Sequence, residues 1–176
     1  MRLGIVVCLL SACRREIGWR GGSGHLDARW SGAEEGTISA PATAEWCPIR
    51  KFLEIRAIQG DTGLALALYP AGTIVAGEYR VVHPPKAESL PPAAGVALRW
   101  LTQTAVRGFE GESGTVVLER SPSGTLSGRV AAGTRSITDT LRAALSGTFQ
   151  DLTVRPQTRG CSAPAPADSD DQDDSE

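Results

Sequence analysis

The feature of this chain that most constrains its fold is a two-residue alternation of apolar and other side chains that recurs along most of its length. Leucines occupy every second position from Leu64 to Leu68, and apolar residues alternate with charged ones from Leu53 to Ala57. Successive side chains of a β-strand point to opposite faces of the sheet, so these runs are typical of half-buried strands. The sequence therefore predicts an all-β fold.

Turn residues divide the alternating runs into hairpins. Gln59-Gly60-Asp61-Thr62 predicts a hairpin over 51–69, and Ser121-Pro122-Ser123-Gly124 predicts a second one over 114–132. The even-numbered residues from Val96 to Val106 share one face of what we interpret as a single long strand. Further strands are expected over 25–31, 36–46, 74–82 and from about Leu141 onward.

The last strand carries a change of phase. Its apolar residues face one way from Leu141 to Phe149, whereas Leu152 and Val154 have the opposite parity, which predicts a β-bulge near 150–151. A turn of helix could precede this strand at 136–139, and the prolines between 84 and 92 indicate a stiff connection. We expect a single antiparallel β-sandwich or barrel of about nine strands with at most one short helix. The side chains placed inside by parity are Leu64, Leu66, Leu68, Val96, Leu98, Trp100, Val116 and Leu118.

The N-terminus has the form of an export signal. Met1-Arg2 precedes the apolar run 3–10, and Leu10-Ser11-Ala12-Cys13 resembles the lipobox of bacterial lipoproteins. The resemblance covers only the signal, and it implies that residues 1–12 are a signal peptide and that the Cys13 thiol is acylated. Twelve residues before the cysteine is short for this class, so a misplaced start codon is an alternative, and a buried first strand is another.

The resemblance also implies a location. Arg14 follows the cysteine, whereas an Asp at that position retains the best-studied lipoproteins at the inner membrane, so the outer membrane of a bacterial envelope is favoured. Ordinary secretion or a periplasmic location is the alternative. No apolar run approaches the ~20 residues that a transmembrane helix needs.

The cysteines and the charge pattern indicate how the exported chain is organised. Cys8 leaves with the signal and Cys13 carries lipid, which leaves Cys47 and Cys161 to form a disulfide. Residues 13–24 are interpreted as a flexible tether, 25–161 as the β-domain and 162–176 as a disordered acidic tail, because the stretch 168–176 contains six acidic residues and no basic one.

Two pairs of residues could carry chemistry. His25 and Asp27 project from one face of a strand, as a base and its orienting carboxylate would, although no third partner is indicated. Glu110 and Glu112 alternate as the carboxylates of a glycosidase or a cation site do, but a solvated glycine-rich turn between two strands is the favoured interpretation. His83 is expected in a loop. Trp30 and Trp100 share parity with the core, and Trp46 is expected to pack on the disulfide beside it.

Other site signatures are absent from the sequence. It contains no phosphate-binding loop, nucleophile elbow, dinucleotide fingerprint or His-Glu-x-x-His, so no metal site or cofactor is predicted. Eighteen basic residues against twenty acidic ones, with the arginines scattered, give no footprint for nucleic acid.

These observations favour a non-enzymatic function. The sequence predicts a lipid-anchored envelope β-domain with a binding or structural role, whose partners are the membrane through its anchor and an envelope protein or a small apolar ligand. A barrel that carries an apolar ligand inside is the first alternative. A hydrolase that uses His25 and Asp27, or Glu110 and Glu112, is the second. A filled core, a roomy apolar lumen and a polar cleft would distinguish the three.

Overall fold

The computed structural model describes residues 24–157 and 160–162. These residues form ten strands and one four-residue helix, which confirms the all-β prediction. Cys13, the predicted signal peptide, the predicted tether up to residue 23 and the predicted acidic tail from residue 163 lie outside the described residues. The elements are β1 (Gly24–Gly32), β2 (Gly36–Cys47), β3 (Phe52–Gln59), β4 (Thr62–Tyr69), β5 (Gly77–Val81), α1 (Pro84–Ala87), β6 (Ala93–Leu101), β7 (Val106–Arg120), β8 (Leu126–Ser136), β9 (Arg142–Leu152) and β10 (Val154–Pro156).

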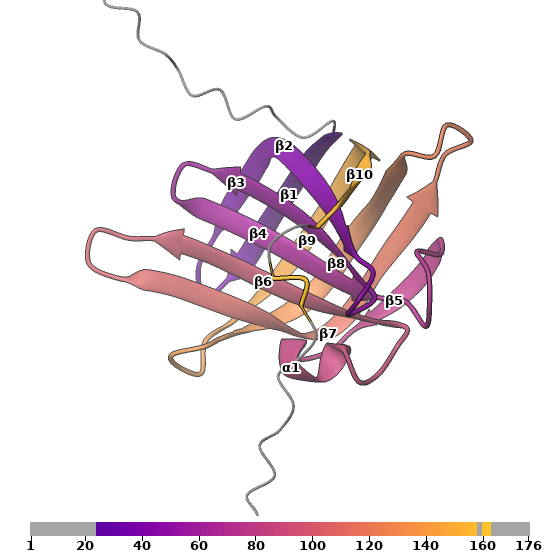
Figure 1. The fold of residues 1–176 in the computed structure, drawn as a ribbon. Coiled ribbons are helices and arrows are strands. Elements are labelled where there is room, and N and C mark those ends of the chain that lie inside the picture. The colour runs from indigo at the N-terminus through magenta and orange to yellow at the C-terminus, as the bar shows by residue number, and fades with distance from the viewer. Residues whose placement is uncertain (1–23, 158–159, 163–176) are drawn as a thin grey trace, which may run out of the picture.

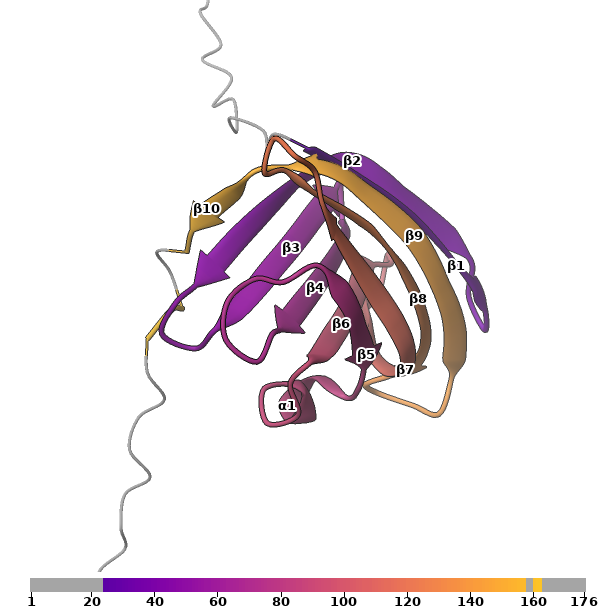
Figure 2. The same cartoon turned by 90° about the vertical axis from the view of Figure 1, so that its right-hand side faces the viewer.

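The strands close into a barrel, because β1 pairs with β2 on one side and with β9 on the other. Around the ring the order is β1, β9, β8, β7, β6, β4, β3 and β2, with β5 inserted between β7 and β6 at one end. Figure 2 looks along the barrel and shows this ring. All pairings are antiparallel except β5 with β6 and β10 with β2. Closure removes most of the exposed sheet edge that an open sheet would present.

The two ends of the barrel differ in their connections. One end, which we call the turn end, carries the four turns at 33–35, 60–61, 102–105 and 137–141, and it lies to the left in Figure 1. The other, the terminal end, carries the start of β1, the 121–125 turn, β5, α1 and β10. The described chain therefore begins and ends at the same end of the barrel.

The lumen is filled by side chains from every long strand. The residues placed inside by parity are buried as predicted, with Trp100 partly buried and packed against the same core. The largest side chains that are almost completely buried are Phe109, Phe149, Leu26, Ile38, Leu53, Ile55, Leu64, Leu66, Leu68, Leu98, Leu118 and Leu126.

Two bulges change the phase of the alternation. The predicted one is confirmed, since the β8–β9 register shifts opposite Asp151, whose φ is 57°, and both Phe149 and Leu152 are buried. A second bulge lies at Glu112, where the β7–β8 register shifts between Gly111 and Ser113. It moves the inward parity of β7 from odd to even residue numbers and gives the strand a sharp local twist.

Two local predictions were wrong. The long strand expected through 96–106 is instead two strands, β6 and β7, joined by a turn at 102–105. The Thr102 N–H donates to the Ala105 carbonyl, and the Ala105 N–H donates to the Thr102 hydroxyl. Such a turn needs neither glycine nor proline, so its sequence signal is weak. The one described helix is not at 136–139 but at Pro84–Ala87, where prolines occupy the first turn, in which their missing N–H groups are not needed.

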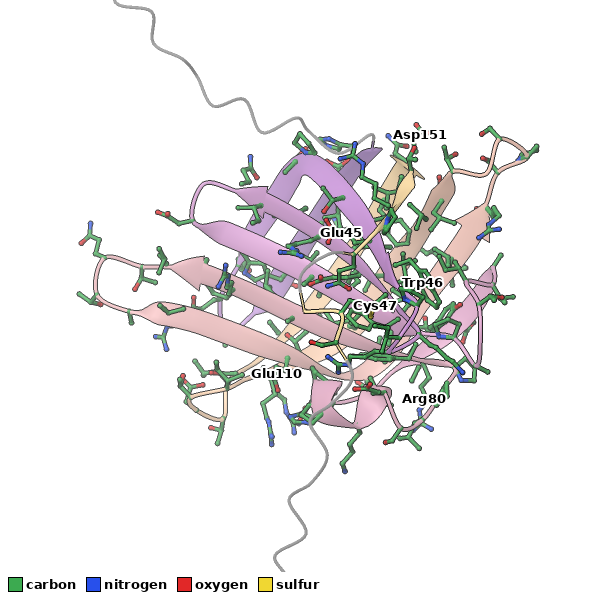
Figure 3. All side chains as sticks on the ribbon, viewed as in Figure 1. Glu45, Trp46, Cys47, Arg80, Glu110 and Asp151 are labelled. Carbon is green, nitrogen blue, oxygen red and sulfur yellow. A yellow bond between two sulfur atoms is a disulfide. The ribbon has the colours of Figure 1, made fainter. Side chains whose placement is uncertain are left out.

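The predicted disulfide is confirmed. Cys47 and Cys161 are bonded, with their Cα atoms 5.4 Å apart, and the bond fastens the segment after β10 to the end of β2 (Figure 3). The expectation that Trp46 packs on this bond is not met, because Trp46 packs against the main core, to which Cys47 does not belong. Alternation along β2 places the two side chains on opposite faces.

A small second cluster lies outside the barrel beside the disulfide. Buried Phe52, opposite Cys47 in the register, packs against Tyr69 with the ring centroids 5.6 Å apart. The Arg50 guanidinium lies over the Phe52 ring and holds Glu88, just after α1, through two hydrogen bonds. This bidentate pair ties α1 to the β2–β3 connection.

The Arg50–Glu88 pair should make the stability of the fold depend on pH. Hydrogen bonding to Arg50 lowers the pKa of Glu88 and raises that of Arg50. Because the pKa of Glu88 is lower in the folded than in the unfolded chain, its ionised carboxylate stabilises the fold at pH values above the unfolded pKa near 4.5. This contribution is lost as the pH falls through the pKa of the folded state. Glu88→Gln should therefore lower the free energy of unfolding by less than about 1 kcal/mol at pH 7, because the pair is partly exposed, and by nothing near pH 2.

Urea denaturation at both pH values measures this difference. Glu78→Gln is the matched control, since Glu78 is exposed and has no ion-pair partner among the described residues. A Glu88→Gln effect of equal size at pH 7 and pH 2 would show that the pair contributes through packing rather than charge.

Candidate functional site

The His25–Asp27 pair acquires a third member in the fold. Ser39 lies directly opposite Asp27 in the β1–β2 ladder, and its hydroxyl donates a 2.6 Å hydrogen bond to Asp27 Oδ1. His25 Nε2 lies 3.0 Å from the same hydroxyl oxygen and 3.4 Å from Asp27 Oδ1. Sequence reasoning missed Ser39, although pairing the two strands across the 33–35 turn would have placed it there.

The proton arrangement of this trio is the reverse of that in a hydrolase triad. A serine hydroxyl has one hydrogen, and here it goes to the Asp27 carboxylate, so the contact with His25 requires Nε2 to carry a proton as donor. A general base must instead accept the serine proton at that nitrogen. The His25 and Asp27 side chains are 40% and 55% exposed, on the outer face of the barrel. The trio is therefore a solvated polar cluster.

The nearest hollow is a separate feature. It has a volume of about 290 Å³ and lies over β1 and β9, lined by Arg29, Ser31 and the segment 144–146. None of the three residues of the polar cluster lines it. It therefore gives the cluster no enclosed place for a substrate.

Glu110 and Glu112 are not in a turn, as the sequence suggested, but within β7, around the second bulge. His83 lies in a connection, as predicted, and its Nε2 is 2.9 Å from a Glu110 carboxylate oxygen. Glu112 contacts Arg135 at 3.1 Å and Arg142 at 3.6 Å. Each carboxylate is thus held by its own basic partner on the outer face.

This pairing decides what the two glutamates can do. The two carboxylates contact different partners and do not converge on one point, as acid–base work across a shared substrate requires. Within 24–157 and 160–162, no group of three or more His, Cys, Asp or Glu side chains is placed to hold a metal ion.

The turn end of the lumen is closed by an aromatic stack. The Trp100 ring lies between Trp30 and Phe109, at centroid distances of 5.2 and 5.3 Å. A Cβ at Gly36 would lie 2.2 Å from the Trp30 ring, so glycine is the residue that leaves room for this indole. Trp30 is buried, and its Nε1 has no hydrogen-bond partner among the described residues. Apolar packing therefore fixes its position.

Arg107, near the start of β7, holds two turns of the turn end through ion pairs. Its side chain lies 3.2 Å from Glu34, after β1, and 3.4 Å from Asp139, in the β8–β9 turn. Hydrogen bonds from the Leu141 N–H and from Ser136, together with the Arg107 charge, lower the pKa of Asp139. The ion pairs hold the turns at 33–35 and 137–141 against β7.

Four half-exposed aliphatic side chains gather on the outside of the turn end: Ile58, Leu101, Val106 and Ile137. We call them the turn-end patch; they are 49%, 52%, 58% and 61% exposed. Leu101 and Val106 are direct cross-strand partners. Ile137 donates its N–H to the Gly108 carbonyl and fills the space beside that glycine. Sequence periodicity missed the patch because it assigned 96–106 to one strand.

A hollow of about 240 Å³ opens within this patch. Ile58, Leu101, Val106 and Trp100 supply its apolar wall, and Arg99, Asp61 and Thr62 supply its polar groups. Gly60 and Gly63 line it without side chains and so leave it concave. Apolar exposure and concavity therefore coincide at this surface.

Comparison with known protein families, with curated proteins and with solved structures finds no match to this chain. Among the described residues, no helix is long and apolar enough to cross a membrane. The function is therefore argued from the surfaces of the barrel and from the N-terminal signal.

Proposed function

We propose that this protein is a lipid-anchored barrel of the bacterial cell envelope that binds a partner, without catalysis, through the outer surface of its turn end. The observation that carries this proposal is the contrast between the two places where a barrel can bind. The lumen is filled by the side chains of the core, and the Trp30–Trp100–Phe109 stack closes it at the turn end. The outside of the same end exposes the turn-end patch and its hollow.

The filled lumen supports a surface role over that of a carrier. A barrel that holds an apolar ligand needs an interior pocket, and such pockets measure about 300–1,000 Å³. The inward side chains of the strands are instead nearly inaccessible to solvent and form one continuous cluster.

The state of the polar residues supports a binding role over hydrolysis. His25, Asp27 and Ser39 form an exposed cluster with the wrong proton direction, and the Glu110 and Glu112 carboxylates are each taken by basic partners. A hydrolase needs groups that converge on one enclosed point.

The proposed anchor rests on the N-terminal signal and on the place where the barrel begins. Cys13 stands at the acylated position of the lipobox-like segment, and β1 starts eleven residues later, at Gly24. Two or three acyl chains on one residue give stable anchoring where a single chain does not. The confirmed disulfide agrees with export to an oxidising compartment.

Cys13→Ala is expected to abolish anchoring. The variant should either move from the membrane fraction to the soluble fraction or keep its signal peptide uncleaved, because no thiol remains to acylate. Cys8→Ala is the matched control, since it changes a cysteine of the apolar run and leaves the lipobox-like segment intact. Intact mass of the membrane-extracted protein should show an acylated N-terminus at Cys13 in the control only. A Cys13→Ala protein that is cleaved and stays on the membrane would end the proposal of a lipid anchor.

A further inference from the structure

We infer that the hollow at the turn end seats one large apolar side chain of a partner protein, whose polypeptide segment lies across the turn-end patch. This inference deepens the proposed function and rests on it. It names the chemistry of the partner and the residues that receive it.

The size of the site selects a small occupant. A hollow of about 240 Å³ lies below the ~300–1,000 Å³ of pockets that enclose a whole small-molecule ligand. The four half-exposed aliphatic side chains give the patch an area comparable to the ~300–600 Å² of functional apolar patches on monomers. This area is smaller than the ~800 Å² that each partner of a stable dimer buries. One anchoring side chain with a short flanking segment fits these dimensions better than a second copy of the barrel does.

The polar groups at the rim select a polypeptide. Arg99 can only donate hydrogen bonds and the Asp61 carboxylate can only accept them. Neither side chain has a hydrogen-bond or ion-pair partner among the residues that the structure describes, and both line the hollow. A peptide backbone presents acceptors and donors together and so complements both. An acyl chain presents neither, and the phosphate of a lipid headgroup would be repelled by Asp61.

The place of the patch favours a partner in solution over the bilayer. β1 begins at Gly24 at the terminal end, and its nine residues lead to the turn end, about 30 Å away at ~3.3 Å per residue. A Gly/Ser-type linker of the eleven residues from Cys13 to Gly24 would span ~18 Å on average. The anchored barrel therefore keeps its terminal end near the membrane and presents the turn-end patch away from it.

The test titrates defined peptides into the mature chain, residues 13–176, with Cys13→Ser so that no acyl chain competes. The probes are N-acetylated, C-amidated pentapeptides Gly-Gly-X-Gly-Gly in which X is Leu, Phe or Trp. The peptide in which X is Ser is the matched control, because it lacks a large apolar side chain. Backbone amide chemical shifts report binding. We expect saturable shifts confined to residues 58–63 and 99–106 with the apolar peptides, at dissociation constants in the millimolar range, and none with the Ser peptide.

Variants separate the patch from the rest of the surface. Val106→Asp should weaken binding at least tenfold, because it puts a hydrated carboxylate beside the hollow. Val75→Asp is the matched control, since Val75 is 59% exposed and precedes β5, at the terminal end, and it should leave binding unchanged. Arg99→Gln should weaken all the apolar peptides several-fold. Thermal melts of each variant show whether the barrel remains folded.

Three outcomes would overturn the inference. One is the absence of any shift with the apolar peptides up to about 10 mM. The second is that octanoate, and not the peptides, shifts these amides, which would assign the hollow to an acyl chain. The third is that vesicles of phosphatidylethanolamine and phosphatidylglycerol bind the wild-type barrel but do not bind the Val106→Asp variant, which would assign the patch to the bilayer. None of them affects the Cys13 test, so failure of this inference remains distinguishable from failure of the proposed anchor.

Discussion

Removal of the Cys47–Cys161 bridge is expected to lower the free energy of unfolding by about 2–5 kcal/mol. The bond closes a loop of 114 residues, so in the chain-entropy account its loss returns on the order of 4–5 kcal/mol of freedom to the unfolded chain. At roughly 3–5 °C per kcal/mol for a domain of this size, the melting temperature should fall by about 6–25 °C.

Melts with and without dithiothreitol, on the wild type and on the double variant Cys47→Ser/Cys161→Ser, measure this effect. The double variant should melt where the reduced wild type does and should not respond to the reductant. If instead the reduced wild type melts within a degree or two of the oxidised protein, the bridge contributes little, and the β2–β10 pairing and the Gln157 hydrogen bonds hold the C-terminal segment without it.

The position of the bridge also predicts a local effect of its loss. β10 is held to β2 by three residue pairs, and Gln157, just after β10, donates its N–H to the Trp46 carbonyl. A parallel pairing of three residues is weak by itself. Hydrogen exchange in the reduced protein should therefore accelerate first in β10 and last in the β7–β8–β9 sheet.

Much of the barrel could be predicted from sequence because its strands obey local rules. Alternation placed the cores of β3, β4 and β8, the turn at Gln59–Thr62 fixed one hairpin, and the parity change after Phe149 located the bulge at Asp151. Each of these signals spans fewer than about twenty residues. The disulfide was predicted from the two cysteines that remain once the expected signal peptide and acylated cysteine are set aside, and the structure bonds Cys47 to Cys161.

The predictions that were wrong have a common physical cause. In each case the local structure depends on an interaction that leaves no periodic pattern in the sequence. The 102–105 turn depends on one threonine hydroxyl, so the alternation continued through it and merged β6 with β7. The bulge at Glu112 depends on the β8 register, which no local pattern encodes. The two parallel pairings, of β5 and β10, arise from tertiary packing of short strands.

The candidate sites were predicted less well than the fold because each is assembled across strands. His25 and Asp27 could be placed on one face from their spacing, but Ser39 joins them only through the β1–β2 register. Glu110 meets His83 from a different connection, and Glu112 meets Arg142 from β9. The turn-end patch combines side chains of β3, β6, β7 and the β8–β9 turn, which only the pairing of these strands brings together.

Phe109→Ala is expected to be the most damaging single substitution at the turn end, at about 3–5 kcal/mol. Phe109 is 1% exposed and stacks on Trp100, so truncation loses its buried area, the cavity term and the ring contact, the last worth about 0.5–1.5 kcal/mol. Val106→Asp, a few residues away but exposed, should change stability by less than about 0.5 kcal/mol. Urea denaturation of the two variants measures this difference, and Phe109→Leu, which removes less volume, keeps the test readable if Phe109→Ala does not fold.

The same variant tests whether the lumen is filled, on which the proposed surface role depends. If Phe109 occupies space that no other side chain can reach, its removal leaves an apolar cavity that stays dry and admits benzene or xenon. Xenon-induced amide shifts around Trp100 and Trp30 should then appear in Phe109→Ala and be absent in the wild type. Benzene should raise the melting temperature of the variant alone, since a ligand that binds only the folded state stabilises it. Xenon or benzene uptake by the wild type at these residues would mean that the interior already holds a pocket. Such a result would favour a barrel that carries an apolar ligand over the proposed surface role.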